Sequence, residues 1–189
     1  ASNTQQGSRG PNVIRIVLVD DHAVIRQALR MLLESHAELE VVADVENGRE
    51  AVQAVEKLQP DVVLMDVVMP GLNGLEATRQ IRRSCPGTRV VMLSGFVDED
   101  QLLDSIRSGA SGYIIKKSDV SELVLAIQTV HRGNSYFSSA LSEGFDLAVL
   151  TPGAVDNLTG KGKFAAGSRT NLARVGVGVV VKDGAPKPD

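Results

Sequence analysis

The sequence predicts an α/β protein built on a parallel β-sheet with helices packed on both of its faces. Two observations lead to this prediction. Between residues 13 and 133, five short runs of apolar, mostly β-branched residues alternate with five longer amphipathic stretches. Glycine or proline follows most of the amphipathic stretches, where a helix would end. Strands that alternate with helices pair in parallel through right-handed crossovers, so helices cover both sides of the sheet.

The first half of this pattern predicts three strands and two helices. Residues 13–19 read VIRIVLV, which is typical of a buried strand. Residues 23–36 carry apolar side chains at helical spacing, and a second strand follows at 40–45. The helix expected at 48–58 ends shortly before a proline, which cannot continue a helix. The run DVVLM at 61–65 is the third strand.

The second half predicts two more strands and three helices. A Pro-Gly pair closes the helix expected at 74–84, and RVVML at 89–93 is the fourth strand. The helix expected at 98–109 begins with acidic residues, which the helix dipole favours, and ends at a glycine. The run GYII at 112–115 is the fifth strand, and the helix expected at 118–133 also ends at a glycine.

Polar side chains follow four of the predicted strands at the point where each strand ends. Asp20 and Asp21 follow the first strand, Asp66 the third, Ser94 the fourth and Lys116 the fifth. The carboxyl ends of parallel strands share one edge of the sheet, so we expect these five side chains to lie close together. An aspartate after a strand can simply cap a helix. Five such groups at one functional edge nevertheless favour a binding site.

The residue types at this edge indicate a cation and a phosphoryl group. Three neighbouring carboxylates repel one another, and burying them without a partner is costly. A hard divalent cation such as Mg²⁺ would relieve the repulsion, because it binds a few carboxylates, a carbonyl and several waters. The cation would attract a phosphoryl group, whose oxygens Lys116 and Ser94 are suited to contact. His22 is expected to have a local structural role, since Mg²⁺ prefers oxygen ligands.

Four motifs of the sequence resemble those of the receiver domains of bacterial two-component response regulators. They are LVDDH at 18–22, LMDVVMPGLNGLEA at 64–77, MLSG at 92–95 and GASGYIIKK at 109–117. The DDH and GYIIKK forms are most similar to the NarL/FixJ branch of LuxR-type regulators. The resemblance covers about residues 13–132. It implies a flavodoxin-like (βα)5 fold, a doubly wound parallel sheet with strand order 2-1-3-4-5.

The resemblance also implies a role for each side chain at the sheet edge. Asp66 is the implied phosphoacceptor, with Lys116 and Ser94 as its catalytic partners. Ser94 and Tyr113 are the implied switch residues. The implied Mg²⁺ ligands are Asp20, Asp21, Asp66 and the backbone carbonyl of Val68. The implied phosphoryl donor is a sensor histidine kinase, and the implied outcome is a change at an output or dimerisation face that serves transcriptional regulation.

Two surfaces are candidates for a homodimer. One is formed by the helix at 98–109, the strand at 112–115 and the helix at 118–133. The other is formed by the helices at 23–36 and 118–133. Both follow from the resemblance, and the sequence leaves the choice between them open.

The composition favours a cytoplasmic protein. The net charge is −3, with 43% hydrophobic and 23% charged residues, as in an ordinary globular protein. No apolar run approaches the roughly 20 residues of a membrane span, so no membrane association is expected. Residues 1–12 lack the apolar segment of a signal peptide. Cys85 is the only cysteine, which fits a reducing compartment.

The C-terminal part of the chain departs from the resemblance. We expect a disordered segment at 1–12, the receiver at 13–133, a linker at 134–142 and an atypical glycine-rich tail at 143–189. A helix-turn-helix needs two uninterrupted amphipathic helices and a basic recognition face. The tail has neither, with six Lys/Arg against five Asp/Glu between 138 and 189. We therefore expect no DNA binding from it, and its role is unknown.

Two other functions compete with a phosphorylated switch. A phosphatase of the haloacid dehalogenase type also uses an aspartate nucleophile and Mg²⁺, but it needs a second aspartate two residues later. That position is Val68, which argues against an enzyme that acts on other molecules. An interaction module that keeps only the fold would not need all five groups at the sheet edge.

Overall fold

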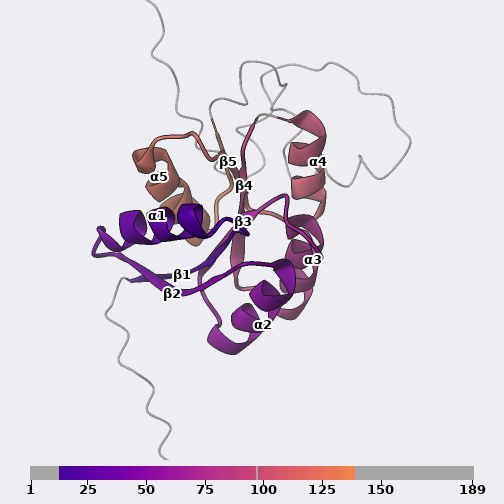
Figure 1. Cartoon of the computed structure of the whole chain (residues 1–189), viewed down its shortest axis with the longest axis horizontal. Helices are drawn as coiled ribbons and strands as arrows, with labels where there is room; N and C mark the ends of the chain where they lie inside the picture. Colours follow the sequence, from indigo (N-terminus) through magenta and orange to yellow (C-terminus); the bar gives the residue numbers. More distant parts are fainter. Residues whose placement is uncertain (1–12, 97, 139–189) are drawn as a thin grey trace, which may run out of the picture.

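The structure, a computed structural model that describes residues 13–96 and 98–138, has three layers with one parallel sheet in the middle (Figure 1). Six strands lie in the order β2-β1-β3-β4-β5-β6. They are β1 (Ile14–Val19), β2 (Leu39–Val45), β3 (Val62–Asp66), β4 (Arg89–Ser94), β5 (Gly112–Ile115) and β6 (Tyr136–Phe137). The predicted flavodoxin-like order 2-1-3-4-5 is confirmed, and one further strand lies beside β5.

Five helices cover the two faces of the sheet. They are α1 (Ala23–Glu34), α2 (Gly48–Leu58), α3 (Gly74–Ser84), α4 (Glu99–Arg107) and α5 (Val120–His131). Figure 1 shows α1 and α5 on one face, with α2, α3 and α4 on the other. None of the helices in the described ranges is both long and apolar enough to cross a lipid bilayer.

Alternate residues of each strand face the two helical layers. In β1, Val17 and Val19 pack in the core cluster that contains residues of α2, α3 and α4. Ile16 and Leu18 pack in the other cluster, with residues of α1 and α5. All four are at most 1% exposed. Because both faces of the central strand β3 are buried, its sequence is apolar from Val62 to Met65, and the polar Asp66 stands at its end.

Several helices are slightly shorter than the sequence pattern predicts. The helix expected at 98–109 spans Glu99–Arg107, because Asp98 caps its start and accepts a hydrogen bond from the Gln101 amide. Gly109 follows its end with a φ of 92°, in the left-handed region that favours glycine and terminates helices. The expected helix at 118–133 similarly spans Val120–His131.

The sixth strand lies inside the segment expected to be a linker, 134–142. The Tyr136 amide donates to the Ser111 carbonyl, and the Ser138 amide donates to the Tyr113 carbonyl at 2.9 Å. Tyr136 and Phe137 are 1% and 5% exposed. The folded unit therefore continues to residue 138, because two aromatic side chains fill the space beside β5. The predictions for 1–12, 139–142 and 143–189 lie outside the described residues.

Candidate functional site

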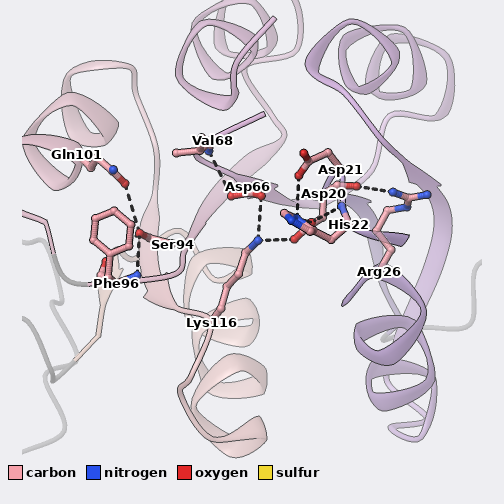
Figure 2. A network of polar contacts seen from close by, with 10 residues as sticks. All are labelled: Asp20, Asp21, His22, Arg26, Asp66, Val68, Ser94, Phe96, Gln101 and Lys116. Carbon is pink, nitrogen blue, oxygen red and sulfur yellow. Dashed lines mark hydrogen bonds and ion pairs between the residues drawn. The ribbon is translucent and has the colours of Figure 1, made fainter. Parts of the chain in front are cut away.

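The carboxyl edge of the sheet brings together most of the side chains selected from the sequence. Asp20 follows β1, Asp66 ends β3, and Lys116 follows β5, so the two aspartates and the lysine approach from three strands (Figure 2). Asp20 and Asp66 are 1% and 5% exposed. β1, β3 and β5 belong to one parallel sheet, with β3 and β4 between β1 and β5. Their carboxyl ends therefore share one edge, which brings the three side chains together.

Lys116 bridges the two buried carboxylates. Its Nζ donates to Asp20 Oδ2 at 2.5 Å and to Asp66 Oδ2 at 2.9 Å. The Val68 amide donates to the other Asp66 oxygen, Oδ1, at 3.2 Å. The Lys116 backbone amide donates to the Ser94 carbonyl at 2.6 Å, which fixes the end of β5 to the end of β4. Both oxygens of Asp66 are thus oriented by donors on neighbouring segments.

Burial and charge act in opposite directions on these groups. Burial raises the pKa of Asp66, the Lys116 hydrogen bond and charge oppose this rise, and the Asp20 charge adds to it. Burial alone would lower the pKa of Lys116, but its hydrogen bonds to Asp20 and Asp66 outweigh that effect and raise it. Lys116 is therefore protonated at neutral pH, and one lysine faces two buried carboxylates.

The acidic cluster fits a hard divalent cation. Asp20, Asp21, His22 and Asp66 each offer one ligand atom, and these atoms lie within 4.8 Å of one another. Asp21 Oδ1 is buried, and its 2.9 Å contact with His22 Nδ1 lacks hydrogen-bonding geometry, so it has no hydrogen-bond donor among the described residues. Oxygen-rich donor sets of this kind suit Mg²⁺.

His22 lies directly before α1, and its ring contacts both members of the acidic pair. Its backbone amide donates to Asp20 Oδ1 at 2.8 Å, and its ring Nδ1 lies 3.1 Å from the same oxygen. The residue precedes α1 at the N-cap position. The imidazole therefore lies beside the carboxylates that the cation would bind.

Ser94 lies at the predicted edge, but its hydroxyl is directed away from Asp66 in Figure 2. Its Oγ donates to the Phe96 carbonyl at 2.8 Å and lies 3.3 Å from Gln101 Oε1. Ser94 would have to leave the Phe96 carbonyl before it could donate to a phosphoryl oxygen.

Tyr113 is completely buried, with 0% exposure, in the core cluster on the α4 side of the sheet. Burial raises the pKa of its hydroxyl, and the neighbouring Ser94 side chain opposes this rise. The contact with Ser94 lacks regular hydrogen-bond geometry, and no other described residue pairs with the hydroxyl. Tyr113, an implied switch residue, is therefore already inside the core in this structure. A switch that uses this residue would have to act through a change in its neighbours.

Two site contacts were not predicted from the sequence. Arg26 donates from Nη1 to the Asp20 carbonyl at 2.5 Å and so holds the loop between β1 and α1. It lies one helical turn after His22, and that spacing could have suggested the contact. The contact between Gln101 and Ser94 depends on how α4 packs, and no local pattern signals it.

Replacing Asp66 with asparagine is expected to stabilise the fold at neutral pH without divalent cations. The folded-state pKa of Asp66 is raised, so the folded chain releases this proton at higher pH than the unfolded chain. Stability is therefore lost as pH rises from the ordinary value of 3.8 through the folded pKa. Urea unfolding between pH 3.5 and 7.5 measures the free energy of unfolding of the variant and of the wild type. The advantage of the variant should shrink towards the acidic end.

Asp104→Asn is a suitable control, because Asp104 is 47% exposed and pairs with Arg107 on α4. A lower stability of Asp66→Asn than of the wild type at pH 7 would contradict the argument. It would mean that the ion pair with Lys116 outweighs the cost of burying the carboxylate.

Comparisons with known proteins identify similar sequences over the same region. The family model described as "Response regulator receiver domain" matches residues 16–128. The transcriptional regulatory protein DegU of Brevibacillus brevis is 43% identical over 125 residues, 66% of this chain and 53% of DegU. The oxygen regulatory protein NreC of Staphylococcus aureus is 44% identical over 130 residues, 68% of this chain and 60% of NreC. The matched region is thus little more than half the length of these relatives.

Solved structures show the same fold. A LuxR-family two-component response regulator from Aurantimonas is 36% identical with a TM-score of 0.67, and the match covers 70% of this chain and 94% of that chain. The signal receiver domain of the response regulator NarL from Mycobacterium tuberculosis is 28% identical with a TM-score of 0.63. That match covers 66% of this chain and 100% of the other.

Proposed function

Because the chain belongs to the response regulator receiver domain family, we propose that it accepts a phosphoryl group on Asp66. The observation that carries this proposal is the pair of hydrogen bonds from Lys116 to Asp66 and Asp20 at the carboxyl edge of the sheet. Incubation with acetyl phosphate and Mg²⁺, followed by electrophoresis in a phosphate-binding gel, tests it. A retarded band is the expected result.

The chemistry follows from the groups around Asp66. One carboxylate oxygen attacks the phosphorus of the donor, and an O–P bond forms as the P–N bond of a phosphohistidine breaks. The product is an acyl phosphate, and the released imidazole takes up a proton. Lys116 can follow the transferred oxygens, because its Nζ already contacts Asp66 Oδ2. Positioning and charge supply most of the catalysis in such transfers.

Mg²⁺ is the cofactor of this proposal. Asp21, Asp66 and the backbone carbonyl of Val68 would hold it directly, with Asp20 acting partly through water. When bound, the ion would neutralise charge on the phosphoryl oxygens. The buried Asp21 Oδ1 without a hydrogen-bond donor among the described residues supports this assignment. Asp20 is already 2.5 Å from Lys116, which suits a less direct role.

Replacing Asp21 with alanine should weaken Mg²⁺ binding roughly tenfold or more, because even indirect supporting groups contribute that much to metal affinity. An NMR titration of the amides around residues 20–22 and 66–68 measures the affinity. The control is Asp104→Ala, which changes an exposed residue of α4 outside the acidic cluster and should bind like the wild type. Identical titration of Asp21→Ala and wild type would place the cation elsewhere.

The chain's own reactions are confined to phosphorylation and dephosphorylation of Asp66 in this proposal. Val68 supports the restriction, because a phosphatase with an aspartate nucleophile would need an acid/base residue at that place. The donor is a sensor histidine kinase, as receiver domains of response regulators interact with such kinases. A cytoplasmic location accords with that donor.

The output of the switch rests on the relatives rather than on the site. DegU is named a transcriptional regulatory protein, and we extend that role to this chain as part of the proposal. Dimerisation through α4, β5 and α5, or through α1 and α5, belongs to the same proposal. That the tail at 143–189 does not bind DNA stays a prediction, which a mobility-shift assay of the full chain can test.

A further inference from the structure

The loop that carries Val68 is held at several points between β3 and α3. The Val67 amide donates to the Leu93 carbonyl at 3.1 Å, and the Gly74 amide donates back to the Val67 carbonyl at 3.2 Å. The far side of the loop is held by α2, because the Gly48 amide donates to the Leu72 carbonyl at 3.2 Å. Residues 67–73 are therefore clamped between the first residues of two helices.

Neither glycine has room for a side chain. A Cβ on Gly74 would lie 1.9 Å from the carbonyl oxygen of Asp66, and a Cβ on Gly48 would lie 2.3 Å from the carbonyl oxygen of Leu72. Real Cβ atoms do not approach backbone oxygens this closely. Both obstacles are backbone atoms, so a rotamer change cannot relieve them. The loop or the helix would have to move.

The local sequence is the same at both places. Asn47 precedes Gly48 and Asn73 precedes Gly74, and each asparagine caps its helix by accepting the amide hydrogen of the third helical residue. Glycine is a poor helix former, so its use as the first residue of both helices requires a reason. Close approach to the loop supplies that reason.

We propose that Gly48 and Gly74 are positioning residues for the cation site, because they set the place of the 67–73 loop and hence of the Val68 carbonyl. The inference rests on the proposed function, since that function requires Mg²⁺. Gly74 lies directly against the backbone carbonyl of Asp66, so a side chain there would displace the phosphoacceptor residue. Gly48 acts from α2, through the Leu72 carbonyl, on a loop whose other end forms the site.

The identity of the ion provides a sharp readout. Mg²⁺ demands nearly ideal octahedral geometry with short bonds, whereas Ca²⁺ accepts longer bonds and irregular geometry. A displaced carbonyl should therefore weaken Mg²⁺ binding more than Ca²⁺ binding. A substitution that only lowered the stability of a chain that remained folded would change neither affinity.

The main experiment titrates Gly48→Ala with MgCl₂ and, separately, with CaCl₂ while NMR follows the amides of residues 66–68. We expect Mg²⁺ affinity to fall about tenfold or more, with a smaller loss for Ca²⁺. Gly87→Ala is the matched control, because a Cβ at Gly87 has nothing within 4 Å. Unchanged Mg²⁺ affinity in a folded Gly48→Ala, or equal losses for both ions, would overturn the inference.

A second measurement needs no substitution, so it remains informative if the variant does not fold. In the wild type, Mg²⁺ should slow hydrogen exchange of the Gly48 amide, which bonds to the loop but contributes no ligand. Unchanged exchange at Gly48, with slower exchange at Val68, would overturn the inference while leaving the proposed function intact. A wild type that binds no Mg²⁺ would instead overturn the proposed function.

Discussion

Replacing Asp66 with alanine is expected to abolish incorporation of a phosphoryl group into the chain. Alanine has no nucleophilic oxygen, and the neighbouring carboxylates are not placed to substitute for it. Asp20 is 1% exposed and bonded to Lys116, and Asp21 contacts His22. Phosphoryl incorporation into Asp66→Ala should fall below detection, whichever donor is used. Intact-mass measurement after incubation with acetyl phosphate and Mg²⁺ follows the expected addition of one phosphoryl group.

The control for this experiment is Asp104→Ala, which removes an exposed carboxylate on α4 and should be phosphorylated like the wild type. The chemical stability of the product adds a second criterion. An acyl phosphate is released by hydroxylamine, whereas a phosphate ester on serine or threonine is not. Undiminished labelling of Asp66→Ala, or labelling that resists hydroxylamine in the wild type, would show that another residue is the acceptor.

A double substitution, Val68→Asn with Phe96→Ala, should speed loss of the phosphoryl group about tenfold or more, roughly 1.4 kcal/mol of barrier. Hydrolysis requires a water in line with the bond between Asp66 and phosphorus. Val68 and Phe96 are 63% and 58% exposed and lie on the loops after β3 and β4. Figure 2 shows Val68 beside Asp66 and Phe96 beside Ser94. Both side chains are apolar, so neither can orient a water by hydrogen bonding.

An asparagine at position 68 could orient that water, as glutamine does in GTPases. Removing the Phe96 ring would open the path to it. The measurement is the decay of phosphorylated protein in excess Mg²⁺ after the donor is removed. Met31→Ala, which truncates a 75% exposed apolar side chain on α1, is the control for exposed apolar surface in general. An unchanged half-life in the double variant would mean that these side chains do not govern access of water.

The sequence was sufficient to predict the fold and the centre of the site, because both depend on short-range patterns. The five apolar runs, each flanked by turn residues, identified the strands that build the sheet. Parallel pairing then placed Asp20, Asp66 and Lys116 at one edge, where the structure has them within hydrogen-bonding distance. Parallel pairing alone was needed for this step, whereas the strand order 2-1-3-4-5 was implied by the resemblance to receiver domains.

Other features depended on contacts that a local pattern does not encode. The direction of the Ser94 hydroxyl depends on the loop after β4 and on Gln101 of α4. The role of Gly48 depends on a carbonyl 24 residues further along the chain, at Leu72. A strand of two residues, such as β6, is too short to show alternation. In each case the missing quantity is the relative placement of two elements.

The short strand β6 also determines whether the sheet ends in a protected edge. Without it, β5 would expose a row of unpaired amides and carbonyls, which is a ready template for strand pairing between molecules and for aggregation. The Ser138 hydroxyl donates to Glu122 Oε1 at 2.7 Å, and the buried Tyr136 hydroxyl lies 3.3 Å from the same oxygen. Burial and the charge of Glu122 raise the pKa of Tyr136 to about 12, so its hydroxyl stays protonated as a donor. A recombinant receiver that stopped at residue 133 would lose this cover, so the natural boundary for expression lies after Ser138.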